Sequence, residues 1–218
     1  MTEPAYLTIA GPARAEIETR RSRFVCDLAR VTTEAEARAV IEQVRAASRD
    51  AKHHCTAFVL GADGATARSN DDGEPSGTAG MPMLEALRGH GLSDVVAVVT
   101  RWFGGTLLGT GGLIRAYGDA VRAGVEAARL VRRERRLLVG LTVPHAAAPR
   151  LENAVRGHAG VAVTDVAYAA RDVTLTLAVA PEAVPGVRTL VAELSSGSAV
   201  LVDLGADWVD VDLGLGLG

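Results

Sequence analysis

The sequence predicts an α+β fold in two domains, and three observations support this prediction. The second half repeats the order strand, helix, strand, strand, helix, strand, which is the ferredoxin-like arrangement. The first half holds a short apolar run, 94–100, of the kind found in central strands. A charged run, 132–136, separates the two halves. We therefore expect an N-terminal two-layer α/β domain over 1–132, a smaller ferredoxin-like domain over 136–206, and a flexible tail over 207–218.

The first elements of the N-terminal domain are strands and one capped helix. Two strands are expected around 7–20 and 22–30, and a third over 53–60. Thr33 and Glu36 have the spacing of a capping box, which predicts that a helix begins between them. The inward face of that helix carries apolar residues at helical spacing, namely Val40, Ile41, Val44 and Ala47.

The remaining elements of this domain surround the central strand. Pro82 fits the first turn of a helix that precedes the strand. A glycine-rich segment, 101–118, follows the strand and leads into a second helix. The apolar face of that helix consists of Leu113, Ile114, Tyr117, Val121, Val125 and Ala128. We expect one mixed sheet whose helices all cover the same face.

The second half has the clearer periodicity. Apolar residues alternate with others through 137–143 and 173–179, as in strands with one buried face. The predicted order is strand 137–143, helix 151–155, strand 161–168, strand 173–179, helix 187–194 and strand 200–204. This order predicts an antiparallel sheet with both helices on one face.

Composition limits the class of protein. Hydrophobic residues make up 48% and charged residues 22% of the 218, which is typical of a globular protein with a substantial core. No apolar run is long enough to span a membrane, and the N-terminus lacks a secretory signal, so we expect a cytoplasmic protein without a membrane partner. With only Cys26 and Cys55, neither a disulfide framework nor a cysteine-rich zinc site is expected. The net charge of −3 provides no general attraction to nucleic acid.

The glycine-rich segment is the first candidate for a binding site. It contains Gly104, Gly105, Gly109, Gly111 and Gly112 before a helix, where backbone N–H groups favour anions. Arg101 and Arg115 flank it and would add positive charge. It is not a P-loop, because no lysine follows the second glycine, and Ile114 stands where a dinucleotide motif needs its third glycine. Tight backbone packing and a contact surface or anion cradle both remain open.

A second candidate is the polar loop over 70–82. It brings three carboxylates and two hydroxyls together, from Asp71, Asp72, Glu74, Ser76 and Thr78. Carboxylates this close together could hold a hard cation or exchange protons, although the spacing is not that of an EF-hand. The alternative is an ordinary Asp-Gly turn in which Ser76 and Thr78 cap the next helix.

The third candidate is the sequence His53-His54-Cys55 in a predicted strand. His53 and Cys55 point to one side and His54 to the other, so at most two of them could share a metal. A Cys55–His nucleophilic pair is conceivable, but no orienting partner is evident. Structural or contact histidines are the favoured interpretation, and we predict no metal site, cofactor or catalytic residue.

These segments, taken in this order, resemble the IMPACT family, specifically its bacterial YigZ-type branch. The matching residues are Arg20–Phe24, His53–Cys55, Asp71–Gly80, Arg101–Gly105, Gly109–Leu113 and Arg115–Tyr117. The resemblance covers roughly 22–131, and the second half fits the companion ferredoxin-like domain by pattern. It implies an architecture similar to two consecutive domains of elongation factor G, with the N-terminal domain like domain IV. Met81 departs from the family by standing where many members have lysine, and Trp102 replaces a common tyrosine.

The resemblance implies a non-enzymatic regulatory or binding protein associated with translation. Eukaryotic members compete for the activator of a starvation-responsive initiation-factor kinase, a pathway that bacteria lack. The expected partner is therefore the translation machinery, that is, a ribosome, an RNA or a translation factor. The alternative is a nucleotide- or anion-dependent enzyme that uses the 70–82 and 104–112 loops. The candidate binding residues are Arg23, His53, His54, Asp71, Asp72, Glu74, Ser76, Thr78, Arg101, Phe103, Gly104, Gly105, Gly109, Gly111, Gly112 and Arg115.

Overall fold

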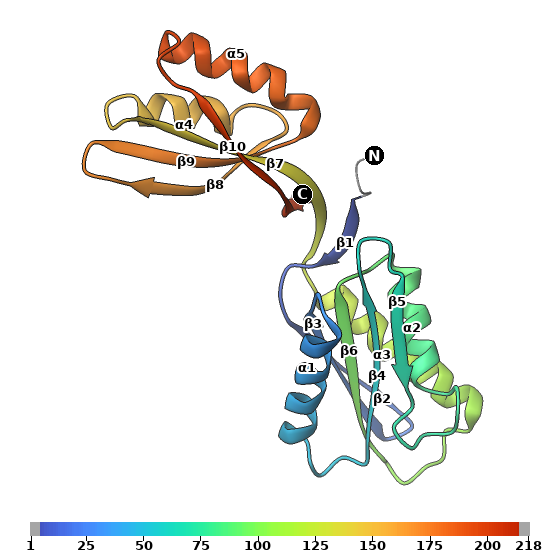
Figure 1. The fold of residues 1–218 in the computed structure, drawn as a ribbon. Coiled ribbons are helices and arrows are strands. Elements are labelled where there is room, and N and C mark those ends of the chain that lie inside the picture. The colour runs from blue at the N-terminus through green and yellow to red at the C-terminus, as the bar shows by residue number, and fades with distance from the viewer. Residues whose placement is uncertain (1–4, 214–218) are drawn as a thin grey trace. The chain divides into compact units, whose positions relative to one another are not determined.

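The computed structural model describes residues 5–213, which divide into two compact units (Figure 1). Of the described residues, 5–133 and 210–213 form the N-terminal unit, and Glu134–Val209 form the C-terminal unit. The α+β class, with a larger α/β domain followed by a smaller one, is confirmed. Among residues 5–213, no helix combines the length and the apolar composition needed to cross a lipid bilayer.

The N-terminal unit is built on a five-stranded sheet in the order β2-β3-β6-β4-β5. Its strands are β2 (Ala13–Thr19), β3 (Ser22–Arg30), β4 (His53–Leu60), β5 (Thr66–Asn70) and β6 (Val95–Trp102). All the neighbouring pairs are antiparallel, so the expected mixed sheet was wrong. The strand expected around 7–20 is divided, because β1 (Tyr6–Ile9) leaves this sheet and pairs with Leu130–Arg133.

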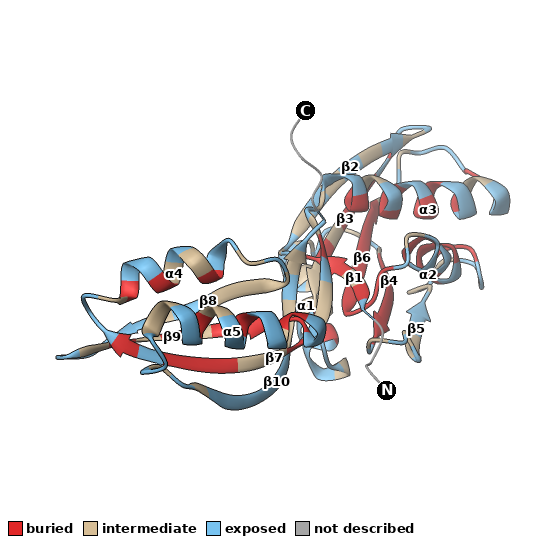
Figure 2. Cartoon of the chain, turned by 90° about the horizontal axis from the view of Figure 1, so that it is seen from above, coloured by how far each residue is buried: buried red, intermediate tan, exposed pale blue. Residues whose placement is uncertain are grey.

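Helices cover both faces of this sheet, which corrects the expected two-layer, one-sided arrangement. Helix α1 (Glu34–Ala47) packs on Phe58, Val96 and Val98. Helices α2 (Gly80–Gly89) and α3 (Thr110–Ala127) pack on the other face, where the alternate residues of β4 and β6 point. The reason is that β4 and β6 are buried along nearly their whole length, as Figure 2 shows. A sheet whose two faces are both buried needs helices packed on each face.

The capping box is present at the start of α1. The Thr33 hydroxyl accepts a hydrogen bond from the Glu36 N–H at 3.2 Å. The Glu36 carboxylate in turn accepts one from the Thr32 N–H at 2.6 Å, which lowers the pKa of Glu36. The helix begins where the sequence predicted.

The C-terminal unit has the predicted order of elements. Its elements are β7 (Leu130–Pro144) from Glu134 onward, α4 (Ala148–Arg156), β8 (Val161–Tyr168), β9 (Asp172–Val179), the 3₁₀ turn η1 (Pro181–Ala183), α5 (Val184–Ser195) and β10 (Leu201–Asp212) up to Val209. The strands run in the order β8-β9-β7, with β10 paired to β7. Both helices contribute to one core on one face of the sheet.

The structure places the division between the units within strands. The charged run 132–136 marks the boundary, since the units divide between Arg133 and Glu134, but it lies inside the continuous strand β7, where Arg136 pairs with Glu134 at 3.0 Å. Residues 207–212, expected in a flexible tail, continue β10 instead. Ion pairs fix this end of the strand, because Asp210 contacts Arg30 at 2.6 Å and Asp212 contacts Arg129. The last part of the expected tail, 214–218, lies outside the described residues.

Candidate functional site

The carboxylate loop, defined here as Asn70–Gly80, is held closed by Asp71. Its Oδ2 accepts a hydrogen bond from the Gly77 N–H at 2.8 Å, and its Oδ1 accepts from Ala79 and Gly80 at 3.0 and 2.8 Å. Burial alone would raise the pKa of Asp71, but these three hydrogen bonds together lower it. The carboxylate thus places its negative charge at the first turn of α2, where the helix dipole favours it. Asp71 is thus the anion that the backbone N–H groups of this loop bind.

Asp72 fastens the same loop to the rest of the unit. Its carboxylate accepts hydrogen bonds from the His54 backbone N–H and from Arg45 at the end of α1, both at 2.7 Å. Its carbonyl oxygen lies 2.9 Å from Nδ1 of His53. Asp72 and Gly73 have φ of 41° and 84°, the left-handed conformation of an Asp-Gly turn. The turn interpretation of this loop is therefore correct at these positions.

The expected caps of α2 are not the ones that the structure uses. The Thr78 hydroxyl donates to the Pro75 carbonyl at 2.6 Å, and Ser76 is exposed. The residue at the N-cap position, Ala79, has no side chain that can accept a hydrogen bond. Asp71 supplies the acceptor from eight and nine residues upstream, which no local capping pattern indicates.

Glu74 is the buried centre of the site. One of its oxygens accepts hydrogen bonds from Arg101 at 2.6 Å and from the Tyr117 hydroxyl at 2.8 Å. The Glu74 and Arg101 side chains are only 4% and 7% exposed. The guanidinium of Arg101 is therefore neutralised inside the unit, which corrects the expectation that it would supply charge to an anion cradle. This buried pair instead joins the carboxylate loop to β6 and α3.

The histidine–cysteine segment, His53–Cys55, is hydrogen-bonded to the carboxylate loop. The Cys55 thiol is buried and donates to the Asp71 carbonyl at 3.0 Å. Burial, together with the nearby carboxylates, raises the pKa of Cys55 to about 12. The thiolate that a nucleophile requires is therefore disfavoured. His54 is also buried, with Nε2 3.1 Å from the Ser48 carbonyl, so the structural interpretation of this segment holds for both residues.

The glycine loop, defined here as Phe103–Gly109, needs its glycines for different reasons. A Cβ on Gly104 would lie 1.9 Å from the carbonyl oxygen of Arg21, so only glycine allows the loop to lie against the β2–β3 turn. The Gly104 N–H also donates to the Ser22 hydroxyl at 3.2 Å. Gly105 and Gly109 have φ of 85° and 72°, which side chains rarely adopt. The packing interpretation accounts for Gly104, and backbone conformation accounts for the other two.

Apolar side chains are exposed around this loop. Among residues 5–133, four large hydrophobic side chains are exposed, and we call them the apolar rim: Met81, Phe103, Leu107 and Ile114. Leu107 is 82% exposed and Phe103 is 54% exposed, and both lie on the glycine loop. Met81 and Ile114 lie near the beginnings of α2 and α3, two helices that pack on the same face of the sheet. The rim is thus confined to one end of the unit.

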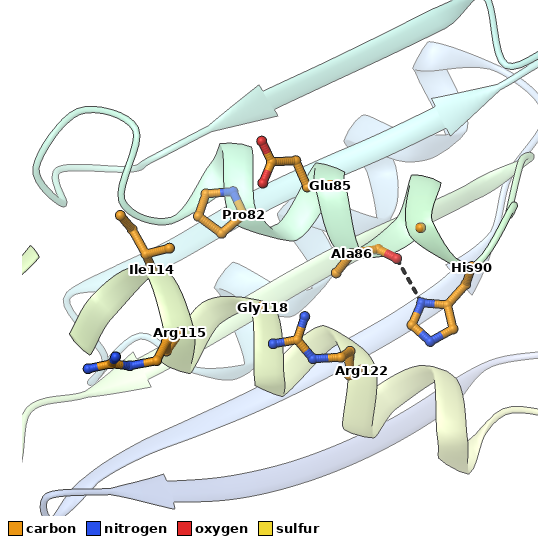
Figure 3. A pocket seen from close by; sticks show the side chains of 9 residues that line it. Pro82, Glu85, Ala86, His90, Ile114, Arg115, Gly118 and Arg122 are labelled. Atoms are coloured by element: carbon orange, nitrogen blue, oxygen red, sulfur yellow. Dashed lines mark hydrogen bonds between the residues drawn. The ribbon is translucent and has the colours of Figure 1, made fainter. Parts of the chain in front are cut away.

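The structure brings some of the predicted site residues together and separates others. Six of them meet around the carboxylate loop: His53, His54, Asp71, Asp72, Glu74 and Arg101. Arg23 lies on the exposed surface, where it pairs with Glu16 at 2.8 Å and stacks 4.6 Å from the Trp102 ring centre. Gly111 is exposed, Gly112 packs against Leu108, and Arg115 faces a groove between α2 and α3 (Figure 3).

Sequence reasoning missed three residues that complete the site. Tyr117 was assigned to the apolar face of its helix, although a buried tyrosine hydroxyl needs a partner, and that need was a usable signal. Ser22, which accepts from Gly104, lies within the Arg20–Phe24 segment that was noted only for its resemblance. Arg45, the partner of Asp72, carries no sequence signal, because an arginine in the last turn of a helix is common.

Comparisons with known proteins find two families and several relatives. The Impact N-terminal domain matches residues 20–125, and a domain of unknown function, DUF1949, matches residues 141–198. The IMPACT family member YvyE of Bacillus subtilis is 43% identical over 152 residues, which is 70% of each chain. The IMPACT family member YigZ of Escherichia coli is 48% identical over 119 residues, 54% of this chain and 58% of that protein.

A solved structure is similar over nearly the whole chain. It is described as the crystal structure of a hypothetical protein, and it is 35% identical with a TM-score of 0.60. The match covers 93% of this chain and 97% of the other. The Impact N-terminal match includes the carboxylate loop, the histidine–cysteine segment and the glycine loop together.

Proposed function

This chain belongs to the IMPACT family, and from that premise we propose that it is a non-enzymatic regulatory protein associated with translation. Its partner would be a ribosome, an RNA or a translation factor. The contact would be made by the glycine loop and the first turns of α2 and α3. The carboxylate loop would support this surface from beneath. The family resemblance supports the link to translation, because eukaryotic members regulate that process.

The observation that carries this proposal is the position of the apolar rim. Exposed hydrophobic side chains that gather in one place mark interaction surfaces in soluble proteins. Here two of the four, Phe103 and Leu107, lie on the glycine loop, whose backbone is held against the β2–β3 turn by Gly104 and Ser22. The neighbouring carboxylate loop is fixed by Asp71 and by the buried Glu74–Arg101 pair. A firmly held base with exposed apolar side chains is suited to binding a partner.

The enzyme alternative receives less support from the same geometry. It would need carboxylates available to a metal–nucleotide complex. Asp71 already accepts three backbone hydrogen bonds, and Glu74 is buried against Arg101 and Tyr117. The charge that the flanking Arg101 would offer to a phosphate is neutralised as well. Binding therefore fits these residues better than catalysis.

Co-sedimentation with ribosomal particles from a bacterial lysate tests the proposal. We expect the wild-type chain to sediment with the particles at low salt. The amount that sediments should fall at least tenfold in the double variant Phe103→Ser/Leu107→Ser. Tyr168→Ser is the matched control, because Tyr168 is a large side chain, 73% exposed, on the C-terminal unit. A steep loss of binding with salt would indicate phosphate contacts.

Two results would contradict the proposal. The first is no sedimentation of the wild type at low salt, and the second is equal sedimentation of the double variant. A thermal shift of the wild type with Mg²⁺ and a nucleotide would instead favour the enzyme alternative. Ligand at 100 times its dissociation constant stabilises a protein by about 2.7 kcal/mol, so such a shift would be easy to detect.

A further inference from the structure

We propose that the groove between α2 and α3 binds an acidic protein segment, which inserts an apolar side chain between Arg115 and Arg122. The groove has a volume of about 330 Å³ and is lined on the α2 side by Pro82 and Ala86 and on the α3 side by Ile114 (Figure 3). The inference rests on the proposed function only in that the partner docks on this end of the N-terminal unit. It adds the chemistry of the partner.

Two arginines give the groove its charge. Arg115 and Arg122 lie seven residues apart on α3, which is two turns, or about 10 Å along the helix axis. Arg115 is exposed and makes no hydrogen bond or ion pair with residues 5–213. Arg122 pairs with Asp119 at 2.7 Å, but both side chains are about half exposed, so solvent screens the pair. Both guanidinium groups remain accessible to an incoming carboxylate.

Gly118 lies between the two arginines on a buried position of α3. The three atoms nearest to a Cβ at this position would all belong to the tip of the flexible Arg122 side chain, the first of them at 3.2 Å. By contrast, a Cβ on Gly124 in the same helix would lie 2.9 Å from the Cys26 sulfur and 3.2 Å from Leu28. Glycine inside a helix is unfavourable relative to alanine. Gly118 instead leaves the groove open at its centre, with the Arg122 guanidinium reaching back across it (Figure 3).

The lining favours an acidic protein segment over a nucleic acid. Glu85 stands on the α2 wall and would repel a continuous row of phosphates. A peptide can carry carboxylates at just the positions that face the arginines. It can also place an apolar side chain over Pro82 and Ala86. Planar guanidinium groups bind carboxylates in a bidentate manner, which fixes orientation as well as charge. An amphipathic helix that lies in a groove of this kind presents anchors three or four residues apart. The expected pattern is acidic, apolar and acidic at that spacing.

Selection from a displayed library of random 16-residue peptides tests this inference on the full chain. We expect the enriched peptides to carry two acidic residues around an apolar one. Their dissociation constants, measured by fluorescence polarisation, should rise at least tenfold for Arg115→Gln and for Arg122→Gln at unchanged Tm. Enrichment of peptides without acidic residues, an affinity of either variant equal to that of the wild type, or no enrichment would overturn the proposal. Binding of a labelled single-stranded RNA that is lost in the same variants would also overturn it.

Substitutions of Gly118 distinguish an effect on peptide binding in the groove from an effect on the stability of the fold. Gly118→Ala should raise the Tm by about 2–4 °C, because it removes a glycine from a helix interior, while weakening peptide binding about threefold. Gly118→Leu should weaken binding more than tenfold. Gly11→Ala is the control for peptide binding, since a Cβ there meets nothing within 4 Å and Gly11 lies outside the groove. Unchanged peptide binding in Gly118→Leu would overturn the inference.

The loop variant keeps this inference distinct from the proposed function. Phe103→Ser/Leu107→Ser should retain peptide binding in the groove, because neither residue lines it. If the wild type fails to sediment with ribosomal particles but binds acidic peptides through Arg115 and Arg122, the link to translation fails and the groove assignment stands. If it sediments with the particles and selects no such peptide, the groove assignment fails alone.

Discussion

The carboxylate loop, Asn70–Gly80, and the glycine loop, Phe103–Gly109, each lead into a helix on the same face of the sheet, but they use their side chains differently. The first turns its charges inward, where Asp71 and Glu74 bind backbone and side-chain donors of the same unit. The second turns Phe103 and Leu107 outward. Both loops are rich in glycine, and both looked like ligand sites in the sequence.

The difference shows what a cluster of polar residues in a loop can mean. A loop without secondary structure leaves backbone N–H groups unpaired, and a nearby carboxylate can satisfy them. Asp71 does this for three residues, so the backbone N–H groups that it binds account for a carboxylate at this position. The glycine loop has no such carboxylate, and the N-cap of α3, Gly109, has no side-chain cap. Under the proposed function, the surface of this loop is the one that contacts the partner.

The largest effect on stability is expected at Glu74, in the carboxylate loop. Glu74→Ala would leave the Arg101 guanidinium buried without its charged partner and would remove the acceptor of Tyr117. Loss of one partner from a buried ion pair costs about 3–5 kcal/mol, and we expect the free energy of unfolding to fall by that amount. Urea denaturation measures it. Glu85→Ala, which removes an exposed glutamate from α2, is the control and should change stability by less than about 0.5 kcal/mol. A loss of less than about 1 kcal/mol for Glu74→Ala would contradict the inward role of this loop.

A smaller, pH-dependent effect is expected at Asp71. Asp71→Asn keeps the shape of the side chain but removes the charge that three backbone N–H groups stabilise. The variant should lose about 1–3 kcal/mol at neutral pH, the cost of weakening hydrogen bonds to partly buried donors. The pKa of Asp71 in the folded chain lies below the ordinary value of 3.8. Its contribution is therefore complete above that value and disappears as the pH falls through the folded pKa.

The stability difference between wild type and Asp71→Asn should therefore narrow as the pH is lowered from about 4 in a series of urea titrations. Asp165→Asn, on an exposed position of β8, controls for the loss of one carboxylate. A difference that stays constant down to pH 2, or grows, would show that the Asp71 charge does not hold the loop.

Local patterns predicted most of the elements but not the partners within the site. The capping box at Thr33 and the alternation through 137–143 depend on residues close in sequence, and both were confirmed. The apolar run 94–100 already indicated a strand buried on both faces, so helices on both sides were implied although one-sided cover was expected. Glu74 lies 27 residues from Arg101 and 43 from Tyr117. No periodicity connects such positions, and only the register of β4 with β6 brings their surroundings together.

Phe103 in the glycine loop was among the candidate binding residues, but its exposed neighbour Leu107 was missed, for a different physical reason. A leucine or phenylalanine in a sequence is assigned to a core by default, because most such side chains are buried. Leu107 is exposed because Gly105 and Gly109 give the loop a left-handed backbone on either side of it. The glycines are visible in the sequence, but the direction in which the loop turns cannot be deduced from them.

The smallest stability effect is expected at Leu107, and it sharpens the contrast with Glu74. Leu107→Ser removes a side chain that is 82% exposed, so little apolar contact is lost on folding. We expect the free energy of unfolding to change by less than about 0.5 kcal/mol in urea titrations, while the association with ribosomal particles falls. Leu108→Ser is the matched control in the same loop, because Leu108 is buried in the core and its replacement should destabilise the unit. A destabilisation of more than about 1 kcal/mol for Leu107→Ser would mean that this side chain packs within the chain in solution, and the glycine loop would then resemble the carboxylate loop in serving its own fold.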